Sequence, residues 1–311
     1  MKIDFKPGYS LFLSLLLCAC AQTSHPEMPA QMGRPTSSIA MEALIDAPGP
    51  IQLETINSAE WKVPLAGLVN LKSPAAIAAK LEDRDEAIQV YVHVIKHPQF
   101  GNFLVDTGVS AQLLKNPDEV GLSWMVRKFM HLEKMQLKTN TAEVVQGLHS
   151  KLSGVFFTHL HLDHVSGMPD IPADVPLYIG QDEASHKDAI NLFVHGSTNA
   201  LLKGKHSLQV WSFADDPQNQ FEGIFDIFSD GSVFAISVPG HTAGSVAYLI
   251  RTTSGPVLLT GDTCHTRWGW ENTVEPGDFT RDNKHNLENL KKLKQLVARH
   301  PLIQVRFGHQ L

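Results

Sequence analysis

The segment THLHLDH, residues 158–164, places three histidines and one aspartate directly after the apolar run VFF. Side chains two residues apart in an extended chain point the same way, so His159 and His161 can converge on one metal ion. As the chain turns into a helix, Asp163 and His164 can point towards a second ion. The spacing therefore predicts a site for two metal ions at the end of a buried strand.

Three later motifs each place a ligand-type residue beside glycine at the end of a strand-like run. They are PGHTAGS with His241, TGDT with Asp262 and FGHQ with His309. Glycine lets the backbone turn sharply at such positions. With the first motif they supply five imidazoles and two carboxylates, which suits two divalent ions that keep open positions for water and substrate. Nitrogen and oxygen ligands without sulfur favour zinc and are also compatible with iron, manganese or cobalt.

These motifs, in this order, resemble the metallo-β-lactamase superfamily of dinuclear metallohydrolases, and the likeness extends from about Ala87 to the C-terminus. The resemblance implies an α+β fold, a four-layer αβ/βα sandwich with the metals at one edge of two sheets. Position by position, it implies one ion held by His159, His161 and His241, a second held by Asp163, His164 and His309, and a bridge from Asp262.

Within the superfamily, the chain is most similar to N-acyl-homoserine lactonases. The segment VYVHVIKHPQFGNFLVDTG resembles the strand pair that opens those enzymes, and VLLTGDT with LKKLKQLVARHP and FGH resembles their C-terminal part. Those lactonases carry a tyrosine three residues after the bridging aspartate, where it contacts the substrate carbonyl. This chain has His265 there. His265 could donate the corresponding hydrogen bond, or it could be an ordinary loop histidine.

The ligand set and the resemblance together predict hydrolysis of a lactone or related ester by hydroxide generated on the metals. Asp163 would also orient that hydroxide and pass its proton to the leaving group, unless it is a ligand only. A glyoxalase II-type thioester hydrolase would use the same seven ligands, but its basic glutathione-binding residues are not evident. A periplasmic β-lactamase is a further alternative, and Asp262 argues against it. A metal-loaded binding or sensing module is the alternative outside enzymes.

Strand-like and helical runs alternate along the chain and must position these motifs. Predicted strands cover residues 87–97, 102–108, 176–180, 232–242, 245–251, 256–263 and 303–309, and predicted helices cover 116–136, 184–202 and 285–300. The first helix carries Leu122, Met125, Phe129 and Leu132 at helical spacing, a pattern typical of core that could instead line a substrate pocket. Trp124 and Met130 of this helix, with Trp268 and Trp270, are further candidates for an acyl-chain wall.

The N-terminus is typical of an export signal. Lys2 and Lys6 precede the apolar run YSLFLSLLLCAC, which is too short to span a bilayer. Its end, LCAC, resembles the bacterial lipobox, which predicts a signal over residues 1–19 and a lipid anchor on Cys20, with ordinary cleavage as the alternative. Residues 20–38 are predicted to be a flexible tether, and residues 39–311 the hydrolase domain. The protein would be a lipoprotein facing the periplasm, with the outer membrane favoured.

The composition narrows the partners. A hydrophobic content of 43% is typical of a soluble globular domain, and a formal net charge of -6 gives no electrostatic reason to expect nucleic acid. The expected partners are therefore a small-molecule substrate and, through the anchor, a membrane. If the signal is removed and Cys20 is acylated, Cys264 is the only free thiol, so no disulfide inside the chain is expected. Cys264 is predicted to pack in the core rather than bind metal.

Overall fold

The computed structural model describes residues 20–311, so the predicted signal over residues 1–19 lies outside the described part of the chain. A sheet of eight strands has the order β2-β11-β9-β8-β6-β5-β4-β7. The strands are β2 Glu27–Pro29, β4 Gln52–Pro64, β5 Asp85–His97, β6 Gly101–Val105, β7 Gln136–Leu137, β8 Leu152–Phe156, β9 Leu177–Ile179 and β11 Leu208–Val210. β4 and β5 form a long antiparallel pair, whereas β6, β8, β9 and β11 run parallel.

A second sheet of six strands has the order β16-β15-β14-β13-β12-β3. Its strands are β3 Arg34–Thr36, β12 Ile224–Asp226, β13 Val233–Ser237, β14 Val246–Thr252, β15 Gly255–Leu259 and β16 Gln304–Arg306. β1 (Cys20–Ala21) and β10 (Lys187–Asp188) form a separate antiparallel pair. The apolar face of each large sheet turns towards the other, and Phe156, Trp211 and Tyr248 are buried between them.

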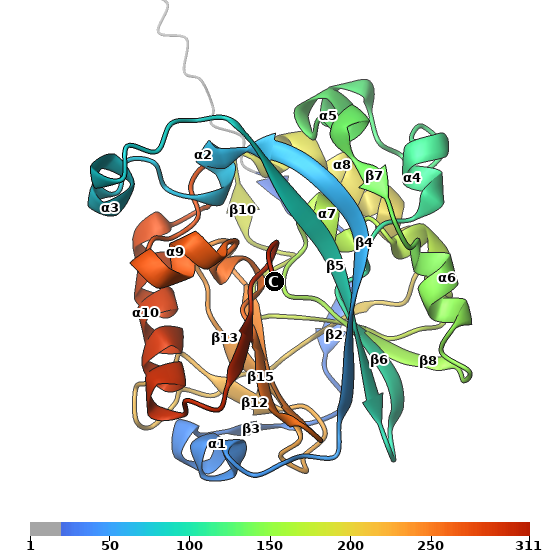
Figure 1. The fold of residues 1–311 in the computed structure, drawn as a ribbon. Helices are drawn as coiled ribbons and strands as arrows, with labels where there is room; N and C mark the ends of the chain where they lie inside the picture. Colours follow the sequence, from blue (N-terminus) through green and yellow to red (C-terminus); the bar gives the residue numbers. More distant parts are fainter. Residues whose placement is uncertain (1–19) are drawn as a thin grey trace, which may run out of the picture.

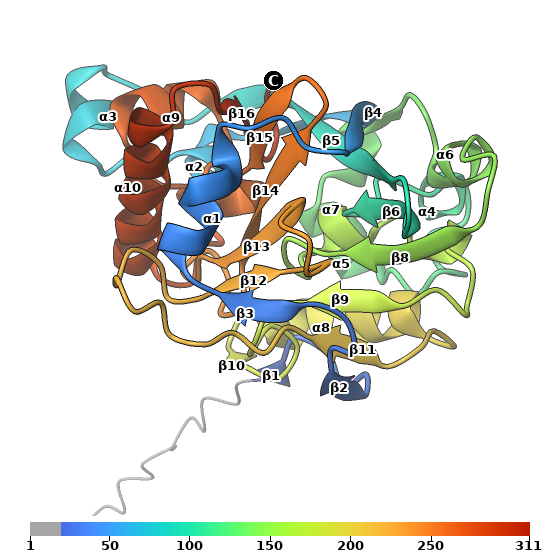
Figure 2. The same cartoon turned by 90° about the horizontal axis from the view of Figure 1, so that it is seen from below.

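Helices cover the outer faces of both sheets, as Figures 1 and 2 show. α4 Ala111–Lys115, α5 Trp124–Phe129, α6 Thr141–Gln146, α7 Leu162–Val165 and α8 Asn191–Leu202 lie on the side of the larger sheet. α1 Ser38–Ile45 and α10 Asn283–Arg299 pack on the other sheet through Met41, Ile45, Leu293 and Leu296. The short α2 Leu65–Leu68, α3 Pro74–Ala78 and α9 Arg267–Asn272 lie near one end of the sheets. This arrangement confirms the predicted four-layer αβ/βα sandwich.

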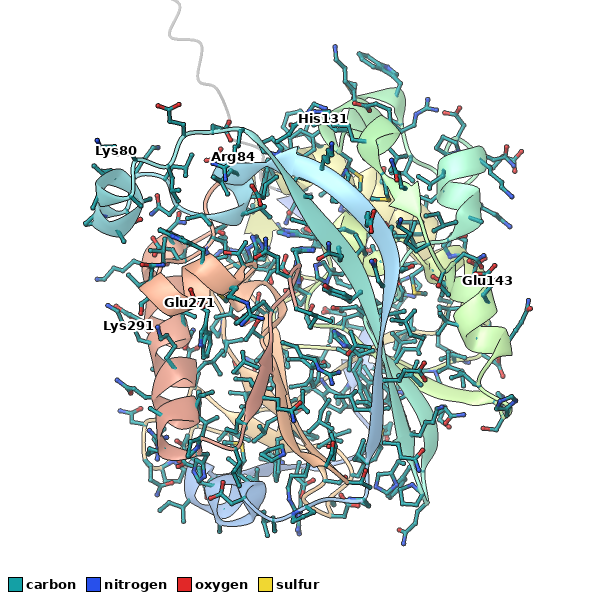
Figure 3. All side chains as sticks on the ribbon, viewed as in Figure 1. Lys80, Arg84, His131, Glu143, Glu271 and Lys291 are labelled. Carbon is teal, nitrogen blue, oxygen red and sulfur yellow. The ribbon has the colours of Figure 1, made fainter. Side chains whose placement is uncertain are left out.

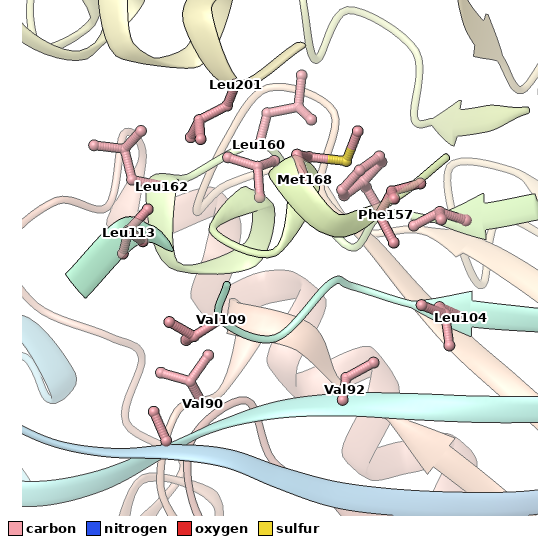
Figure 4. Packing of buried hydrophobic residues seen from close by; sticks show 14 of the residues in the cluster. Val90, Val92, Leu104, Val109, Leu113, Phe157, Leu160, Leu162, Met168 and Leu201 are labelled. Atoms are coloured by element: carbon pink, nitrogen blue, oxygen red, sulfur yellow. The ribbon is translucent and has the colours of Figure 1, made fainter. Parts of the chain in front are cut away.

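The core on the helical side of the larger sheet fixes the metal-binding segment. Val90 and Val92 of β5 face Val109, and Leu160 and Met168 pack above them in the same cluster (Figure 4). These side chains are almost fully buried. Since each buried aliphatic side chain contributes about 1.5–3 kcal/mol by leaving water, this packing anchors the loop that follows β8.

The topology explains why distant motifs meet. β13 and β15 each pair antiparallel with β14, and β16 pairs parallel with β15, so β13, β15 and β16 end at the same edge of their sheet. The loops that follow them carry His241, Asp262 and His309. The loop after β8 of the facing sheet brings the segment from His159 to His164 to these three residues.

The predicted flexible tether over residues 20–38 is wrong for most of its length. β1 pairs with β10, β2 with β11 and β3 with β12, and α1 begins at Ser38. Gln22 and Thr23 are buried, and Gln22 Nε2 donates to Leu160 O at 2.8 Å. The polar composition suggested a linker, but short edge strands need only backbone pairing and a few buried side chains.

One predicted helix differs from the structure, and a long strand was not predicted. The helix predicted over residues 116–136 shortens to α5 and the 3-10 turn η1 Leu132–Lys134, and Met125 and Phe129 are exposed rather than core. No strand was predicted over Gln52–Pro64, where the structure has β4. Among residues 20–311, no helix has the length and apolar character needed to cross a membrane.

Candidate metal centre and substrate pocket

Seven side chains from four loops converge at one edge of the two sheets. They fall into two groups, and within each group all the ligand atoms lie within 4.8 Å of one another. The first group is His159, His161 and His241, and the second is Asp163, His164, Asp262 and His309. These are the seven residues predicted as metal ligands. His265 joins His241 and Asp262 in a third group of the same kind. The structure therefore places all eight predicted site residues in one cluster.

Asp262 Oδ2 lies at the centre of the cluster. The Nε2 atoms of His159 and His241 lie 3.6 and 3.5 Å from it, on the side of the first group. The Nε2 atoms of His164 and His309 lie 3.3 and 3.4 Å from it, on the side of the second. One carboxylate oxygen thus faces both groups, which is the position that a bridging ligand requires.

Close backbone packing brings Asp262 to that position. Gly261, with φ of +50°, turns the chain after β15, and a Cβ on Gly308 would lie 2.3 Å from Asp262 Oδ1. Glycine reaches such backbone angles without the penalty that a Cβ carries. Alanine at Gly308 would push Asp262 out of the centre. The glycines beside Asp262 and His309 therefore have a steric reason.

The cluster contains buried polar atoms that no protein group satisfies. Among residues 20–311, His159 Nε2, His164 Nε2, Asp262 Oδ1 and both ring nitrogens of His265 have no hydrogen-bond partner. Such atoms are costly to bury unless a ligand satisfies them. Five imidazoles and two carboxylates around one point match two divalent ions, so the residues present fit the metals that the sequence predicted.

Hydrogen bonds on the far side of the imidazoles fix which nitrogen faces the cluster. His164 Nδ1 lies 2.8 Å from Asp106 Oδ2, and His309 Nδ1 lies 2.9 Å from Gln89 O. His159 Nδ1 lies 3.1 Å from Thr158 Oγ1. When these Nδ1 atoms carry the proton, Nε2 is left as the free ligand atom. His161 is the exception, because its Nδ1 lies 2.9 Å from His241 Nε2 and so faces the cluster.

Asp106 supports the ligand loop from beneath and was not predicted from the sequence. Its carboxylate accepts from the Thr158 backbone N–H and hydroxyl, both at 2.8 Å, in addition to His164. Its φ of +54° is uncommon for a residue other than glycine. Asp106 stands in the motif LVDTG, so the signal that identified Asp262, a carboxylate beside glycine at a strand end, could have found it.

Glu183 joins two of the ligand loops and was also missed. Its buried carboxylate accepts from Leu160 N at 2.6 Å and, on the other oxygen, from Thr242 Oγ1 at 2.6 Å and Gly244 N at 3.0 Å. Burial raises the pKa of Glu183, which these hydrogen bonds oppose. It ties the loop of His159 and His161 to the loop of His241.

Burial and the local charges set the protonation of the imidazoles. Burial lowers the pKa of His161 to about 4 and holds the pKa values of His159 and His241 well below the ordinary value. These three imidazoles are therefore neutral near pH 7, as metal ligands must be. Burial also opposes a charge on His164, but the carboxylates of Asp262, Asp106 and Asp163 raise its pKa well above the ordinary value.

A pocket with a volume of about 330 Å³ leads from the surface to the cluster. Its floor includes His161, Asp163, His241, Asp262, His265 and His309, and its walls include Trp61, Val63, Pro64, Leu68, Ile88, Phe129, Met130, His131, Ile190, Asn191, Val194 and Phe279. Figure 3 places His131 at the end of the molecule where α2 and α5 lie. Among the described residues that line it, none is lysine or arginine. The pocket therefore suits an apolar or amphiphilic substrate with a polar group at the cluster.

The predicted acyl-chain wall is partly right. Phe129 and Met130 line the pocket. Trp268 packs against the main core, and the Trp270 ring lies 5.8 Å from the Phe307 ring, so neither tryptophan borders the site. α9 directs them inwards. Sequence proximity to Asp262 suggested the site, but the helix turns these side chains away from it.

Cys264 packs as predicted and does not join the metal groups. It is buried against Leu290 and Phe307, its Sγ donates to Thr266 O at 3.3 Å, and burial raises the pKa of its thiol to about 12. A neutral thiol is a poor metal ligand.

Comparison with known proteins agrees with this geometry. Residues 86–309 match the family described as the metallo-beta-lactamase superfamily, which is more than half of the 311 residues. The chain belongs to the metallo-beta-lactamase superfamily. It is a hydrolase of that superfamily, with a His/Asp cluster that can bind divalent metal ions.

The chain is similar to several curated lactonases. It is 26% identical over 231 residues to the N-acyl homoserine lactonase AttM of Agrobacterium fabrum, which covers 72% of this chain and 83% of that protein. It is 26% identical over 215 residues to an N-acyl homoserine lactonase of a Bacillus species, which covers 68% of this chain and 77% of that protein. Both alignments leave more than a quarter of this chain unmatched.

Solved structures with this fold include lactonases. A quorum-quenching N-acyl homoserine lactone lactonase superposes with a TM-score of 0.61 at 18% identity, covering 86% of this chain and 95% of that chain. The dizinc quorum-quenching lactonase AidC superposes with a TM-score of 0.57 at 13% identity, covering 85% of this chain and 88% of that chain. At these identities the likeness shows the fold.

Proposed function

We propose that this protein is a metal-dependent lactonase that opens a lactone ring, or cleaves a related ester, on a substrate with an acyl chain. The observation that carries the proposal is the apolar pocket that ends at the His/Asp cluster. Met130, Val194 and Leu68 line the pocket, where an acyl chain would lie with its carbonyl at the cluster. Sequence similarity to N-acyl homoserine lactonases supports the same substrate class.

Two bound divalent ions, for which zinc is the best match to the ligands, would activate a water and polarise the substrate carbonyl. Asp163 is placed to handle the proton, since it lines the pocket and its Oδ2 lies 3.4 Å from His309 Nε2. It accepts a proton from the attacking water as the new C–O bond forms. It returns that proton to the alkoxide when the ester C–O bond breaks.

His265 would donate a hydrogen bond to the substrate carbonyl, or it would serve as a further metal ligand with His241 and Asp262. Its Nε2 lies 2.9 Å from Asp262 Oδ2, it lines the pocket, and neither ring nitrogen has a hydrogen-bond partner within the described part of the chain. A buried imidazole with two free nitrogens can orient one towards Asp262 and donate the other N–H to a substrate oxygen. This is the role that the lactonase tyrosine would have at the same position.

The alternatives fit the pocket less well. A glyoxalase II-type hydrolase must bind the charged glutathione part of its thioester, and the described pocket walls offer no lysine or arginine for it. A β-lactamase of this superfamily does not use an aspartate as a bridge, whereas Asp262 faces both ligand groups here. The lactone therefore remains the substrate class that the site supports best.

Catalytic efficiency is expected to rise with acyl-chain length until the pocket is full. Burial contributes about 0.8 kcal/mol per methylene at most, so kcat/KM should increase several-fold for each added pair of carbons. Phe129→Ser should flatten this dependence because Phe129 lines the pocket, whereas Leu302→Ser should leave it unchanged because Leu302 is exposed elsewhere. The proton released on ring opening of N-acyl-homoserine lactones measures the rate. Near-background rates across the series, with clear turnover of thioesters or β-lactams, would refute the lactonase.

We also propose that the mature protein carries a lipid on Cys20 and faces the periplasm, with the outer membrane favoured. The support is the motif LCAC behind the apolar run. Radioactive palmitate should label the wild-type protein in cells, and Cys20→Ser should abolish the label because the thioether carrier is gone. Unlabelled wild-type protein recovered in the soluble fraction would refute the anchor.

A further inference from the structure

Six exposed hydrophobic side chains lie on three segments that also supply residues to the pocket wall, and we call them the apolar rim. They come from α5, from the start of α8 and from the loop before α10: Trp124, Met125, Phe129, Leu192, Phe193 and Phe279. Their exposed fractions range from 46% for Phe279 to 68% for Phe193. Exposed apolar side chains gathered in this way mark an interaction surface.

The rim is continuous with the pocket. The rings of Phe129 and Phe279 meet edge to face at 5.2 Å, and both residues line the pocket wall. On α8, Asn191 and Val194 line the pocket, and the two residues between them, Leu192 and Phe193, are exposed. Any partner that covers the rim therefore also covers the entrance through which substrate passes.

Cys20 lies close to the rim, and the chain that follows it is held against the domain. Cys20 pairs with Asp188 of β10, only four residues before Leu192, and Ala21 O lies 2.8 Å from His195 Nδ1 of α8. Two residues after Cys20, Gln22 is buried. An extended chain spans at most about 3.6 Å per residue, so a lipid on Cys20 would hold the domain within about 7 Å of the bilayer surface on this face.

We propose that the apolar rim docks on the lipid bilayer, so that the pocket opens into the membrane interface and takes amphiphilic lactones or esters from it. The inference rests on the proposed lipid anchor and deepens the proposed function by naming where the substrate comes from. A lipid on Cys20 would hold this face of the domain against the bilayer, and the rim is the apolar surface on that face.

The chemistry of the rim favours a bilayer over a charged partner. The formal net charge of -6 gives no general attraction to anionic lipid, so apolar contact must supply the binding. Tryptophan and phenylalanine are side chains that enter the interfacial region of a membrane. Docking should therefore depend little on salt concentration and on the fraction of anionic lipid.

Quenching of Trp124 by brominated lipid tests the docking. The full lipidated protein is reconstituted in phosphatidylcholine vesicles with or without bromine on the acyl chains, and Trp124→Phe identifies the contribution of this side chain. We expect brominated lipid to quench the emission of the wild type, and Trp124→Phe to lose that quenched component. Equal emission in both kinds of vesicle would overturn the proposal, and so would a wild type that palmitate does not label.

Turnover in vesicles tests the consequence for substrate. Phe193→Asp should lower the rate on a long-chain lactone dissolved in the bilayer by about tenfold, because an aromatic side chain no longer inserts. The rate of Phe193→Asp on a short-chain, water-soluble lactone should equal that of the wild type. The control is Leu302→Asp, which changes a similarly exposed side chain after α10, and its rates on both lactones should equal those of the wild type.

The outcomes separate the two proposals. If no lactone is hydrolysed but Trp124 is quenched, the proposed function fails and the docking stands. If the short-chain lactone is hydrolysed but Trp124 is not quenched, the docking fails alone. If light scattering shows that Phe193→Asp dissociates a dimer and quenching is absent, the rim is a contact between two copies of this chain and the docking is wrong.

Discussion

Asp262→Ala is expected to lower kcat/KM for lactone hydrolysis by about a thousandfold or more, the largest single effect in the protein. Asp262 Oδ2 faces both ligand groups, at 3.3 Å from His164 Nε2 and 3.6 Å from His159 Nε2. Its removal would take the shared ligand from both ions and leave Asp163 as the one carboxylate beside the five imidazoles. Steady-state kinetics on the purified, metal-supplemented variant measures the loss.

A matched control is available close to the pocket. Asp278→Ala removes an exposed carboxylate next to Phe279 that belongs to none of the metal groups. Its activity should equal that of the wild type. Circular dichroism of the two variants shows whether each keeps the fold, so a loss of activity in Asp262→Ala can be separated from unfolding. An Asp262→Ala protein that is folded and retains a large share of the wild-type rate would contradict the bridging role.

Asp163→Asn is expected to lower kcat by about a hundredfold to ten-thousandfold, the range of proton transfer by a positioned side chain. The Asp163 side chain reaches the pocket, and its Oδ2 lies 3.5 Å from His164 Nε2 and 3.4 Å from His309 Nε2. Asparagine keeps an oxygen that can bind metal but cannot take up a proton at neutral pH. KM should change little, because the apolar walls that bind the acyl chain are intact.

The choice of leaving group distinguishes proton transfer from metal binding at Asp163. An aryl ester with an acidic phenol needs no proton on its leaving group, so Asp163→Asn should lose much less activity on it than on a lactone whose leaving group is an alkoxide. Equal losses on both substrates would show that Asp163 acts only as a ligand. The comparison uses one variant and one metal-loaded sample, so a change in metal content affects both rates alike.

The sequence predicted the parts of the fold in which pattern and environment agree. The apolar runs that became β5, β6, β13, β14 and β15 are buried in the sandwich, and α10 carries a clear helical stripe. β4 was missed because it lies near the edge of its sheet, where one face is open and its alternation is weak. β1, β2 and β3 were missed because strands of two or three residues are too short to show a recognisable sequence pattern.

The candidate site was predictable to the extent that its ligands stand in recognisable motifs. His159, His241, Asp262 and His309 lie beside glycine or in the dense THLHLDH segment, so their residue types and order were enough. Glu183 has no such mark, because its role depends on two loops that meet only in the folded chain. Nothing in the sequence could show that Trp268 turns inwards while Phe279 reaches the pocket, since that depends on how α9 and the following loop pack.

The central claim is a cluster that holds two metal ions, and elemental analysis of the purified protein tests it most directly. The wild type, loaded with zinc and freed of excess metal, should contain about two ions per chain, because two groups of ligands share Asp262. Asp262→Ala should contain markedly fewer, and Asp278→Ala the same number as the wild type. A fully loaded, active wild-type protein with only one ion per chain would contradict the dinuclear centre.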